Sequence, residues 1–562
     1  FVYISLNELV NAERVLNKAI RLQPNLVDAY INISMMYFIM GKYDLSIKSL
    51  KDSIEIDPKN IKAYYNLGSV YLEIEKLDLA KEQFLKVIDL NPNNDSALLN
   101  LGVSYRKEGD LKQSISCFKK CIKLNPLNKF GHYNLGLSYS KIGLIKEALK
   151  FYSKSLEIDN KMVEAIHNMG VLKDKLGEYD KALRFFNEAL KINNMHFISL
   201  GQKLKVERHI CDWNSHENII GWHKNNEIIS KRIQPRDLMY LIDDPSTDLA
   251  VSRDLYEREF KRIPINLKPK KKEKIHIGYF SADFRNHPVA LLITRIFELH
   301  DKSKFKIYAY SFGSKKSDEM TKRIKEGVDK FRDVKDMSDI EISDCVREDE
   351  IDIAIDLMGY TGDARPSIFS LKIAPIQINY LGFSGTTGNK MIDFIIADTK
   401  LITKEEKDFY SEKIIYMKNS AMCCDDTLVI SKNIEKNHNN KLPEGAFVFA
   451  CFNNHFKISP LEFDIWMELL KEVKNSYLWL KITNKLAMEN IIKEATLRNI
   501  NPDKLIFAQH VGFNEHLQRH SQADLFLDTF NYNAGSTCMI SLMFGLPVLT
   551  LYGKSYHSRM SS

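Results

Sequence analysis

A histidine lies in a short polar turn between two apolar segments of this chain. The stretch IHIGYFSADFRNHPVALLI begins as an apolar strand, continues through the turn that carries His287, and ends in an apolar helical pattern. Pro288 directly after the histidine indicates a helix start, and this edge of an open α/β sheet is where ligands bind. Histidine also changes its charge near neutral pH. His287 is therefore either a group that faces a ligand or a residue that only caps the helix.

A second turn of this kind has the composition of an anion site. The stretch NYNAGSTCMISLMFG passes from a strand into a helix through Gly535, Ser536 and Thr537. Backbone N–H groups at a helix start attract negative charge, and the two hydroxyls can add hydrogen bonds, so this turn could cradle a diphosphate. A glycine-rich turn before a helix is, taken alone, most often only a turn.

Other polar turns follow strand-like segments in the same way. CFNNHFKISP places Asn454 and Lys457 between a strand and a helix, and EHLQRHSQAD carries His516 and Arg519. The long stretch DLMGYTGDARPSIFSLKIAPIQINYLGFSGTTG adds two glycine-rich loops. Each signal is weak alone, but together and in this order they predict one polar cleft.

The elements that must position these turns are strands alternating with helices, from about residue 274 onward. Segments such as KIHIGYFSA, FKIYAYSF and IDIAIDLM form a first series, and a second series runs from AFVFACFNN to GLPVLTLYG. This alternation predicts parallel sheets. Two doubly wound sheets in tandem form a cleft, and nucleotide or sugar-nucleotide ligands commonly bind between such halves.

The first two hundred residues repeat every 34 residues instead. Glycines mark the turn inside several repeats, and prolines recur once per repeat, the series continuing in phase as asparagines: Pro24, Pro58, Pro92, Pro126, Asn160 and Asn194. A helix-turn-helix period of this length is similar to that of tetratricopeptide repeats. It predicts an α-solenoid whose units pack only on their neighbours and present an extended concave surface.

One position of the repeat does not fit a packing role. An asparagine recurs there on the first helix of five successive units: Asn32, Asn66, Asn100, Asn134 and Asn168. Its amide both donates and accepts hydrogen bonds, so it can pair with the main chain of an extended polypeptide whatever the side chains of that polypeptide are. The alternative is that each asparagine bonds locally between neighbouring units.

Bulk composition excludes several classes of protein. A length of 562 residues predicts two to four domains, and 44% hydrophobic with 27% charged residues is ordinary for a soluble protein. The net charge of +7 is too mild to indicate nucleic-acid binding. No apolar run approaches the length of a membrane helix. We therefore expect neither a nucleic-acid nor a membrane partner.

The cysteines and the ends of the sequence give information on the cellular location. The eight cysteines are scattered without the spacing of a zinc site, which favours reduced thiols in a cytoplasmic protein and predicts no metal. The sequence begins at Phe1 inside an apparent helix and stops shortly after a strand. We interpret it as a fragment, so the lack of a targeting signal carries little weight.

Five stretches together resemble a known family. GYFSADFRNHP, GYTGDARPSIFSLKIAPIQINYLGFSGTTG, FNNHFKISP, EHLQRHSQADLFLDT and GLPVLTLYGKSYHSR are similar to the O-linked N-acetylglucosamine transferases, glycosyltransferase family 41, and to its bacterial members in particular. The repeats resemble that family too. The resemblance implies a GT-B fold of two Rossmann-like lobes. It also implies an inverting, metal-independent transfer without a cofactor, from a nucleotide sugar such as UDP-N-acetylglucosamine to Ser or Thr hydroxyls of proteins.

The resemblance also implies the domains and the site. We expect the repeat array over 1–200, a helical connector and basic linker over 201–270, an N-terminal catalytic lobe over 271–430, and a truncated C-terminal lobe that binds the nucleotide sugar over 431–562. The implied donor-site residues are Lys457 on the departing diphosphate, Asn454 on the donor, His516 and Arg519 beside the nucleotide, and Gly535, Ser536 and Thr537 at the diphosphate.

The first lobe would supply the groups that act on the sugar and on the acceptor. His287 matches the active-site histidine of the family, and it would either accept the proton of the acceptor hydroxyl or orient the sugar. Tyr360 is a second catalytic candidate, and Thr361, Gly385 and Thr386 would shape the pocket with it. Acceptor polypeptides would bind in the repeat superhelix.

Three positions depart from the family pattern. Gly535 stands where animal members have a histidine, Ile540 where an acidic residue usually contacts the ribose, and Asp352 where a second active-site histidine is expected. These departures keep two alternatives open. One is a GDP-fucose-dependent protein O-fucosyltransferase, and the other is a repeat scaffold whose transferase half has lost its activity.

Overall fold

The computed structural model describes the chain except for residues 1, 6–7, 216–232, 261–266, 315–316 and 428–441. Two compact units make up the chain, Phe1–Met195 and His196–Ser562. The first is a helical array and the second is built on parallel sheets, which confirms the predicted fold class. Two parts of the predicted connector over 201–270 fall outside the described residues. None of the helices in the described ranges is long and apolar enough to cross a membrane.

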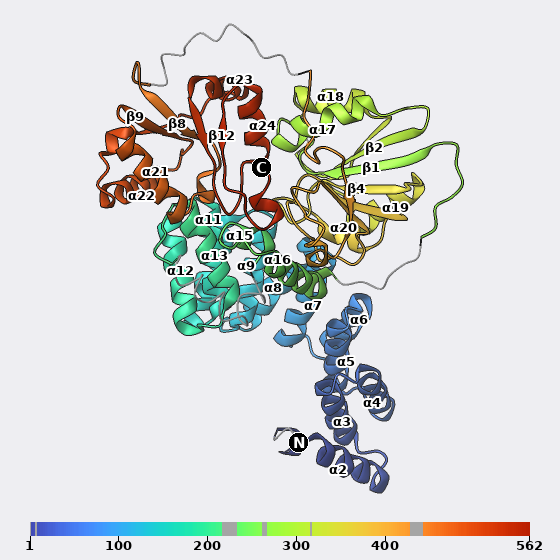
Figure 1. Ribbon diagram of the computed structural model, residues 1–562. Helices are drawn as coiled ribbons and strands as arrows, with labels where there is room; N and C mark the ends of the chain where they lie inside the picture. Colours follow the sequence, from blue (N-terminus) through green and yellow to red (C-terminus); the bar gives the residue numbers. More distant parts are fainter. Residues whose placement is uncertain (1, 6–7, 216–232, 261–266, 315–316, 428–441) are drawn as a thin grey trace. The chain divides into compact units, whose positions relative to one another are not determined.

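The first unit is a series of antiparallel helix pairs (Figure 1). Successive helices pack on one another along the chain, as the 34-residue period predicts. The helices are α1 Val2–Ser5, α2 Leu9–Leu22, α3 Val27–Ile39, α4 Tyr43–Ile56, α5 Ile61–Glu73, α6 Leu77–Leu90, α7 Asp95–Glu108, α8 Leu111–Leu124, α9 Lys129–Lys141, α10 Ile145–Ile158, α11 Val163–Lys175 and α12 Tyr179–Ile192.

In the four pairs from α5–α6 to α11–α12, an aromatic ring of the second helix packs directly on a glycine of the first helix. A Cβ built on Gly102 would lie 2.6 Å from Phe118, and one on Gly170 would lie 2.6 Å from Phe186. Both rings are completely buried. The same contact recurs in the α5–α6 and α9–α10 pairs. In these four pairs the glycine is required because any side chain there would push the two helices apart.

The turns inside the repeats need a left-handed backbone. Gly41, Gly109, Gly143 and Gly177 all have positive φ, which confirms that they mark the turns. The remaining turn in this phase carries Glu75, which adopts the same conformation with φ of 57°. A residue with a Cβ is disfavoured there, and its exposed ion pair with Lys107, at 3.4 Å, offsets little of that cost.

We expect Glu75→Gly to stabilise the array by about 1 kcal/mol, because it removes the strain of a left-handed non-glycine residue. Slower amide hydrogen exchange across α5 and α6 would report the gain. Gly109→Ala is the matched opposite change, since a Cβ there meets no atom within 4 Å and only the positive φ opposes it. Faster exchange in Glu75→Gly would contradict the prediction.

The second unit begins with a helical connector. Its described helices are α13 Phe197–His209, α15 Pro235–Met239 and α16 Pro245–Leu255, followed by one π-helical turn, η1 Tyr256–Phe260. The connector is fixed to the last described segment by a buried ion pair: Asp248 Oδ2 lies 3.0 Å from His557 Nε2. Asp243 adds bonds to the backbone N–H groups of Lys554 and Ser555, both at 2.8 Å.

The first sheet has seven parallel strands in the order β3-β2-β1-β4-β5-β6-β7. Its alternate residues face two separate cores: Ile277 and Tyr279 pack towards α17 and α18, whereas Phe280 packs towards α19 and α20 (Figure 1). The elements are β1 Ile275–Ser281, α17 Pro288–Leu299, β2 Phe305–Ser311, α18 Glu319–Gly327, β3 Lys330–Asp333, α19 Asp339–Glu348, β4 Ile353–Asp356, α20 Pro366–Ser370, β5 Ile376–Asn379, β6 Phe394–Ala397, η2 Lys407–Phe409 and β7 Lys413–Tyr416.

The second sheet has five parallel strands in the order β10-β9-β8-β11-β12. Strand order turns back at β8, as it does at β1 in the first sheet, so each sheet has a switch point at which ligands bind. The elements are β8 Phe447–Cys451, η4 His455–Lys457, α21 Pro460–Glu472, β9 Ser476–Leu480, α22 Lys485–Leu497, η5 Pro502–Lys504, β10 Leu505–Phe507, α23 Phe513–Gln518, η6 Arg519–Gln522, β11 Leu525–Leu527, α24 Gly535–Met543, β12 Val548–Leu549 and η7 Tyr556–Ser558.

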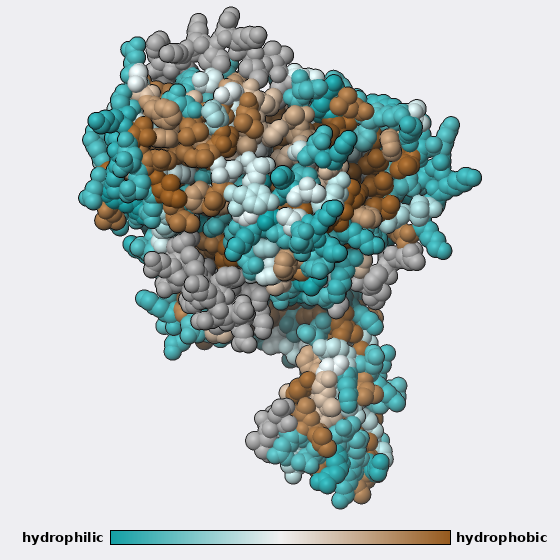
Figure 2. Space-filling model, viewed as in Figure 1, coloured by the Kyte–Doolittle hydropathy of each residue, from teal (hydrophilic) through white to brown (hydrophobic). Residues whose placement is uncertain are grey.

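Hydrophobic side chains gather on the visible face of the part that carries the second sheet (Figure 2). Leu542 and Leu549 are each 55% exposed, and Leu551 and Tyr552 are each 50% exposed. Leu542 lies on α24, and the other three lie on or shortly after β12, which is an edge strand of this sheet.

Candidate functional site

One cavity of about 380 Å³ lies where strands of both sheets end. Its walls come from the turns after β1, β4 and β5 of the first sheet and after β8 and β11 of the second. The carboxyl ends of parallel strands are where doubly wound sheets bind ligands. The cavity brings together six of the predicted residues: His287, Thr361, Asn454, Lys457, Gly535 and Ser536.

The amine of Lys457 is fixed in this cavity by the turn that precedes α24. Its Nζ donates a hydrogen bond to the carbonyl oxygen of Asn533 at 2.9 Å and lies 4.2 Å from the ring centroid of Tyr532. Burial lowers the pKa of Lys457 to about 8, although the nearby Asp528 carboxylate acts in the opposite direction. A partly desolvated cation on a cavity wall attracts an anion that enters the cavity.

The start of α24 faces the same cavity. Gly535 and Ser536 lie in the first turn of this helix, which follows Asn533 and the N-cap residue Ala534. The first N–H groups of a helix have no carbonyl partner within it, and they carry partial positive charge. Together with the Lys457 amine they form a site for an anion, such as a diphosphate, that can accept hydrogen bonds from both.

His287 lies on the opposite wall, at the first sheet. It is the N-cap residue of α17, and its Nδ1 accepts a hydrogen bond from the N–H of Val289 at 3.3 Å. The same nitrogen lies 3.4 Å from Asp283 Oδ2. Burial lowers the pKa of His287, while Asp283 acts to raise it. The capping interpretation is therefore confirmed, because Nδ1 caps the helix. His287 also lines the cavity, and contact with a ligand through Nε2 stays a prediction.

The predictions for Tyr360, Gly385 and Thr386 need correction, since none of them lines the cavity. The hydroxyl of Tyr360 donates to the carbonyl oxygen of Thr387 at 2.6 Å, and that of Thr386 donates to Glu412 at 2.6 Å. A Cβ on Gly385 would meet Met239 at 2.5 Å. The loop that carries Gly385 and Thr386 is turned inward because the buried Glu412 carboxylate needs hydrogen-bond donors.

Three predicted donor-site residues also lie off the cavity wall. Thr537 follows Ser536 on α24, and each helical residue turns its side chain by about 100°. The His516 ring packs edge-on against Phe452, and burial lowers the pKa of His516 to about 3. Arg519 is 2% exposed and donates to the carbonyl oxygen of Gln509 at 3.1 Å. The side chains of His516 and Arg519 are thus used for packing and hydrogen bonding within the second lobe.

Asp352 lies at the amino ends of the strands of the first sheet, opposite the ends that face the cavity. It precedes β4 and accepts a hydrogen bond from the N–H of His276, near the start of β1, at 2.9 Å. Lys272 pairs with it at 3.0 Å. Since β1 and β4 are parallel, His287 lies at the far end of these strands. The expectation that Asp352 stands in the place of a second active-site histidine is wrong.

Part of the cavity wall comes from the connector, which no motif in the sequence indicates. Arg236 on α15 and Tyr240 at its end both line the cavity. The Tyr240 ring lies 4.9 Å from that of Tyr532 and 5.2 Å from that of Phe456, measured between centroids. No local pattern indicates this, because more than two hundred residues separate Tyr240 from Phe456 and from Tyr532.

The recurring asparagines of the array make local bonds in several repeats. Nδ2 of Asn100 donates to the Tyr65 hydroxyl at 3.1 Å, and Nδ2 of Asn168 donates to the Tyr133 hydroxyl at 3.0 Å. Asn134 donates to a carbonyl oxygen of its own helix at 2.9 Å. The alternative of a bond between neighbouring units therefore holds at Asn100 and Asn168. Each bond uses one N–H, so polypeptide binding by the ladder stays a prediction.

The chain matches family models along most of its length. The model described as Glycosyl transferase family 41 matches residues 255–440 and 426–562. Models of the tetratricopeptide repeat match residues 36–75, 96–128, 61–94, 131–162 and 163–194.

Curated relatives carry related names. A probable UDP-N-acetylglucosamine–peptide N-acetylglucosaminyltransferase of Arabidopsis thaliana is 34% identical over 284 residues, which cover 50% of this chain and 29% of the relative. The Caenorhabditis elegans UDP-N-acetylglucosamine–peptide N-acetylglucosaminyltransferase is 23% identical over 402 residues, which cover 52% of this chain and 35% of the relative. The matched part of the chain thus spans about a third of these relatives.

A solved structure shares the fold. A mutant of the Thermobaculum terrenum O-GlcNAc transferase superposes with a TM-score of 0.58 over 83% of this chain and 84% of that one. At 22% identity this likeness concerns the fold alone.

Proposed function

Because the chain belongs to glycosyl transferase family 41, we propose that it transfers N-acetylglucosamine from UDP-N-acetylglucosamine to Ser or Thr hydroxyls of proteins. The proposal rests mainly on one observation: the Lys457 amine and the first turn of α24 face one cavity, with His287 on its other wall. The repeat array would bind the acceptor polypeptide.

Lys457 would act on the leaving group. When the bond between the sugar and the diphosphate breaks, negative charge grows on the diphosphate, and groups fixed in advance stabilise it most. The amine is fixed by Asn533, and the N–H groups of Gly535 and Ser536 are fixed by the helix. Neither has to reorganise while the bond breaks.

His287 has two roles that correspond to two tautomers. With the proton on Nε2, its Nδ1 accepts the Val289 N–H as in this structure, and Nε2 donates to the substrate and orients it. With the proton on Nδ1 and turned to Asp283, Nε2 becomes the base that accepts the proton of the acceptor hydroxyl. The lowered pKa keeps the ring neutral at pH 7 in both cases.

A radiolabelled-donor assay tests the function. The chain should transfer label from UDP-N-acetylglucosamine, and not from GDP-fucose, to a Ser- and Thr-containing peptide, and a chelator should leave the rate unchanged. UDP should raise the melting temperature more than GDP, because a ligand that binds the native state stabilises it. Transfer from GDP-fucose alone would support the fucosyltransferase alternative. No shift with any nucleotide would support the inactive scaffold.

The ionisation of Lys457 predicts an alkaline limb in the pH profile. The amine of the free enzyme loses its proton above about pH 8, so kcat/KM should fall above that pH by a factor approaching ten per pH unit. Lys457→Arg should retain some activity without this limb, since a guanidinium stays charged. An alkaline limb of the same pKa in the arginine variant would assign it to another group.

We also retain the domain division into 1–200, 201–270, 271–430 and 431–562, and we propose a cytoplasmic location. Support for the location comes from the eight cysteines, all of which are unpaired. Limited proteolysis tests the boundaries, and cleavage inside 271–430 or 431–562 before the connector would contradict them.

A further inference from the structure

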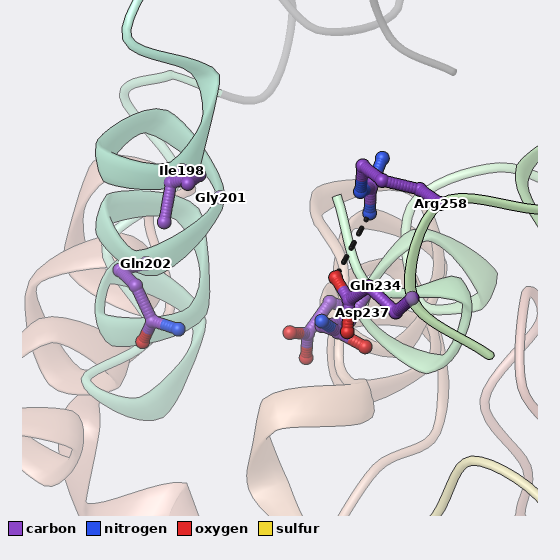
Figure 3. Close-up of a pocket in the computed structure, with 7 residues that line it drawn as sticks. Ile198, Gly201, Gln202, Gln234, Asp237 and Arg258 are labelled. Atoms are coloured by element: carbon purple, nitrogen blue, oxygen red, sulfur yellow. Dashed lines mark hydrogen bonds and ion pairs between the residues drawn. The ribbon is translucent and has the colours of Figure 1, made fainter. Parts of the chain in front are cut away.

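A second cavity of about 230 Å³ lies on the connector and is separate from the donor site (Figure 3). One wall is α13, with Ile198, Gly201 and Gln202, and the other consists of Gln234 and Asp237 at α15 together with Arg258 and Glu259 of η1. In Figure 3 the Gln202 side chain extends from α13 towards the side of the cavity on which Gln234 and Asp237 lie.

The amides that line this cavity are uncommitted. Gln202 and Gln234 make no side-chain hydrogen bond within the part of the chain that the structure describes. Asn100, Asn134 and Asn168 of the array, by contrast, each have a local partner. Gln202 stands 34 residues after Asn168, so it continues the period of the asparagines with a longer amide side chain. A carboxamide without a partner can both donate to and accept from a polypeptide main chain.

The other side chains of the cavity argue against other ligand classes. The cation Arg258 is already paired with Asp254 and, at 3.2 Å, with Glu259. Asp237 is held by Arg208 at 2.9 Å. A phosphate would therefore meet carboxylates rather than an available cation. Ile198 is the one large apolar side chain in the lining, so a lipophilic ligand would bury little surface.

Helix α15 relates this cavity to the donor site. Its residue Asp237 lines the second cavity, while Arg236 and Tyr240 line the first. A helix is only about 10–12 Å across with its side chains, so a chain that extends past α15 needs about three or four residues to reach from one cavity to the other.

We propose that the cavity between Gln202 and Gln234 binds the main chain of the acceptor polypeptide a few residues away from the Ser or Thr that is modified. The proposal rests on the proposed function, because the acceptor hydroxyl must reach the donor site. It makes the connector, and not only the repeat array, a part of acceptor binding, and it requires no particular acceptor sequence at this point.

The test uses the full chain and a fluorescently labelled, extended peptide that contains Ser and Thr. Gln202→Leu and Gln234→Leu should each raise the Kd of the peptide, measured by anisotropy, by about threefold to tenfold, the effect of one lost hydrogen bond. The KM for the peptide should rise in parallel, with kcat unchanged. Gln202→Asn should retain most of the affinity because it keeps the amide. Gln113→Leu, the same change at an exposed position of α8, should have no effect.

The readouts separate the possible failures. An unchanged Kd in both Gln202→Leu and Gln234→Leu would overturn the proposal, and so would a wild-type chain that does not bind the peptide. An unchanged thermal shift with UDP shows that each variant is folded. Peptide binding that depends on Gln202 in a chain that transfers no sugar would support this cavity and refute the proposed function alone.

Discussion

Lys457→Met is expected to lower the rate of glycosyl transfer by about 100-fold to 1,000-fold, the usual effect of removing one fixed group that stabilises charge in the transition state. The methionine side chain fills similar space but cannot neutralise a departing diphosphate. The loss should appear mainly in kcat, since the charge of the leaving group grows as the bond breaks. Single-turnover transfer of labelled sugar is the measurement.

The stability of Lys457→Met should not fall. Burial lowers the pKa of this amine to about 8, so the folded state holds its proton less tightly than the unfolded chain does. Removing the charge therefore leaves the melting temperature unchanged or raises it. Lys471→Met is the matched control on α21 of the same lobe, where the side chain is 38% exposed. Equal transfer by Lys457→Met and the wild type would end the assignment of the donor site.

Asp248→Ala is expected to lower the free energy of unfolding of the second unit by about 3–5 kcal/mol, because it leaves the buried His557 without its charged partner. His557 is completely buried, and its Nε2 lies 3.0 Å from Asp248. Urea unfolding followed by tryptophan fluorescence measures this unit alone. All four tryptophans, Trp213, Trp222, Trp466 and Trp479, lie after Met195.

The double variant Asp248→Leu/His557→Leu should lose less stability than Asp248→Ala, since two apolar groups can replace a buried ion pair. It should also remove a pH dependence. Burial acts to lower the pKa of His557, but Asp248 raises it above 6.5 overall, and burial raises the pKa of Asp248. Both shifts mean that the folded state holds the protons of Asp248 and His557 more tightly than the unfolded chain does. The pair therefore contributes most to the free energy of unfolding below pH 6.5. This contribution falls as the pH rises through the raised pKa of His557. A double variant less stable than Asp248→Ala would contradict this account.

The same pair should matter for the donor site. His557 Nδ1 bonds to the carbonyl oxygen of Asn531, and the N–H of Asn533 donates to the carbonyl oxygen of His557 at 2.8 Å. These contacts hold the turn whose Asn533 and Tyr532 fix Lys457. His557→Gln should therefore lower kcat, because it loosens the turn that fixes the Lys457 amine.

Some of this architecture was determined by the sequence itself. The 34-residue period defines the helix pairs, because each repeat packs only on its neighbours and its turns depend on local backbone preferences. The polar turns after the strands predict the cavity for a similar reason, since parallel strands bring their carboxyl ends to one edge. His287, Lys457 and Ser536 could be selected in this way, together with the family resemblance.

Other features were decided only by the tertiary structure. Glu75 takes a left-handed conformation that its residue type disfavours, because the packing of the repeats requires a turn there. Tyr360 and Thr386 have the composition of site residues, yet Thr387 and the buried Glu412 take up their hydroxyls. Arg236 and Tyr240 reach the donor site from a connector without any motif. The spacing of residues in the sequence determines local geometry. The direction of a side chain in a loop depends instead on distant buried groups that need hydrogen-bond partners or apolar contacts, and only the folded chain brings those groups together.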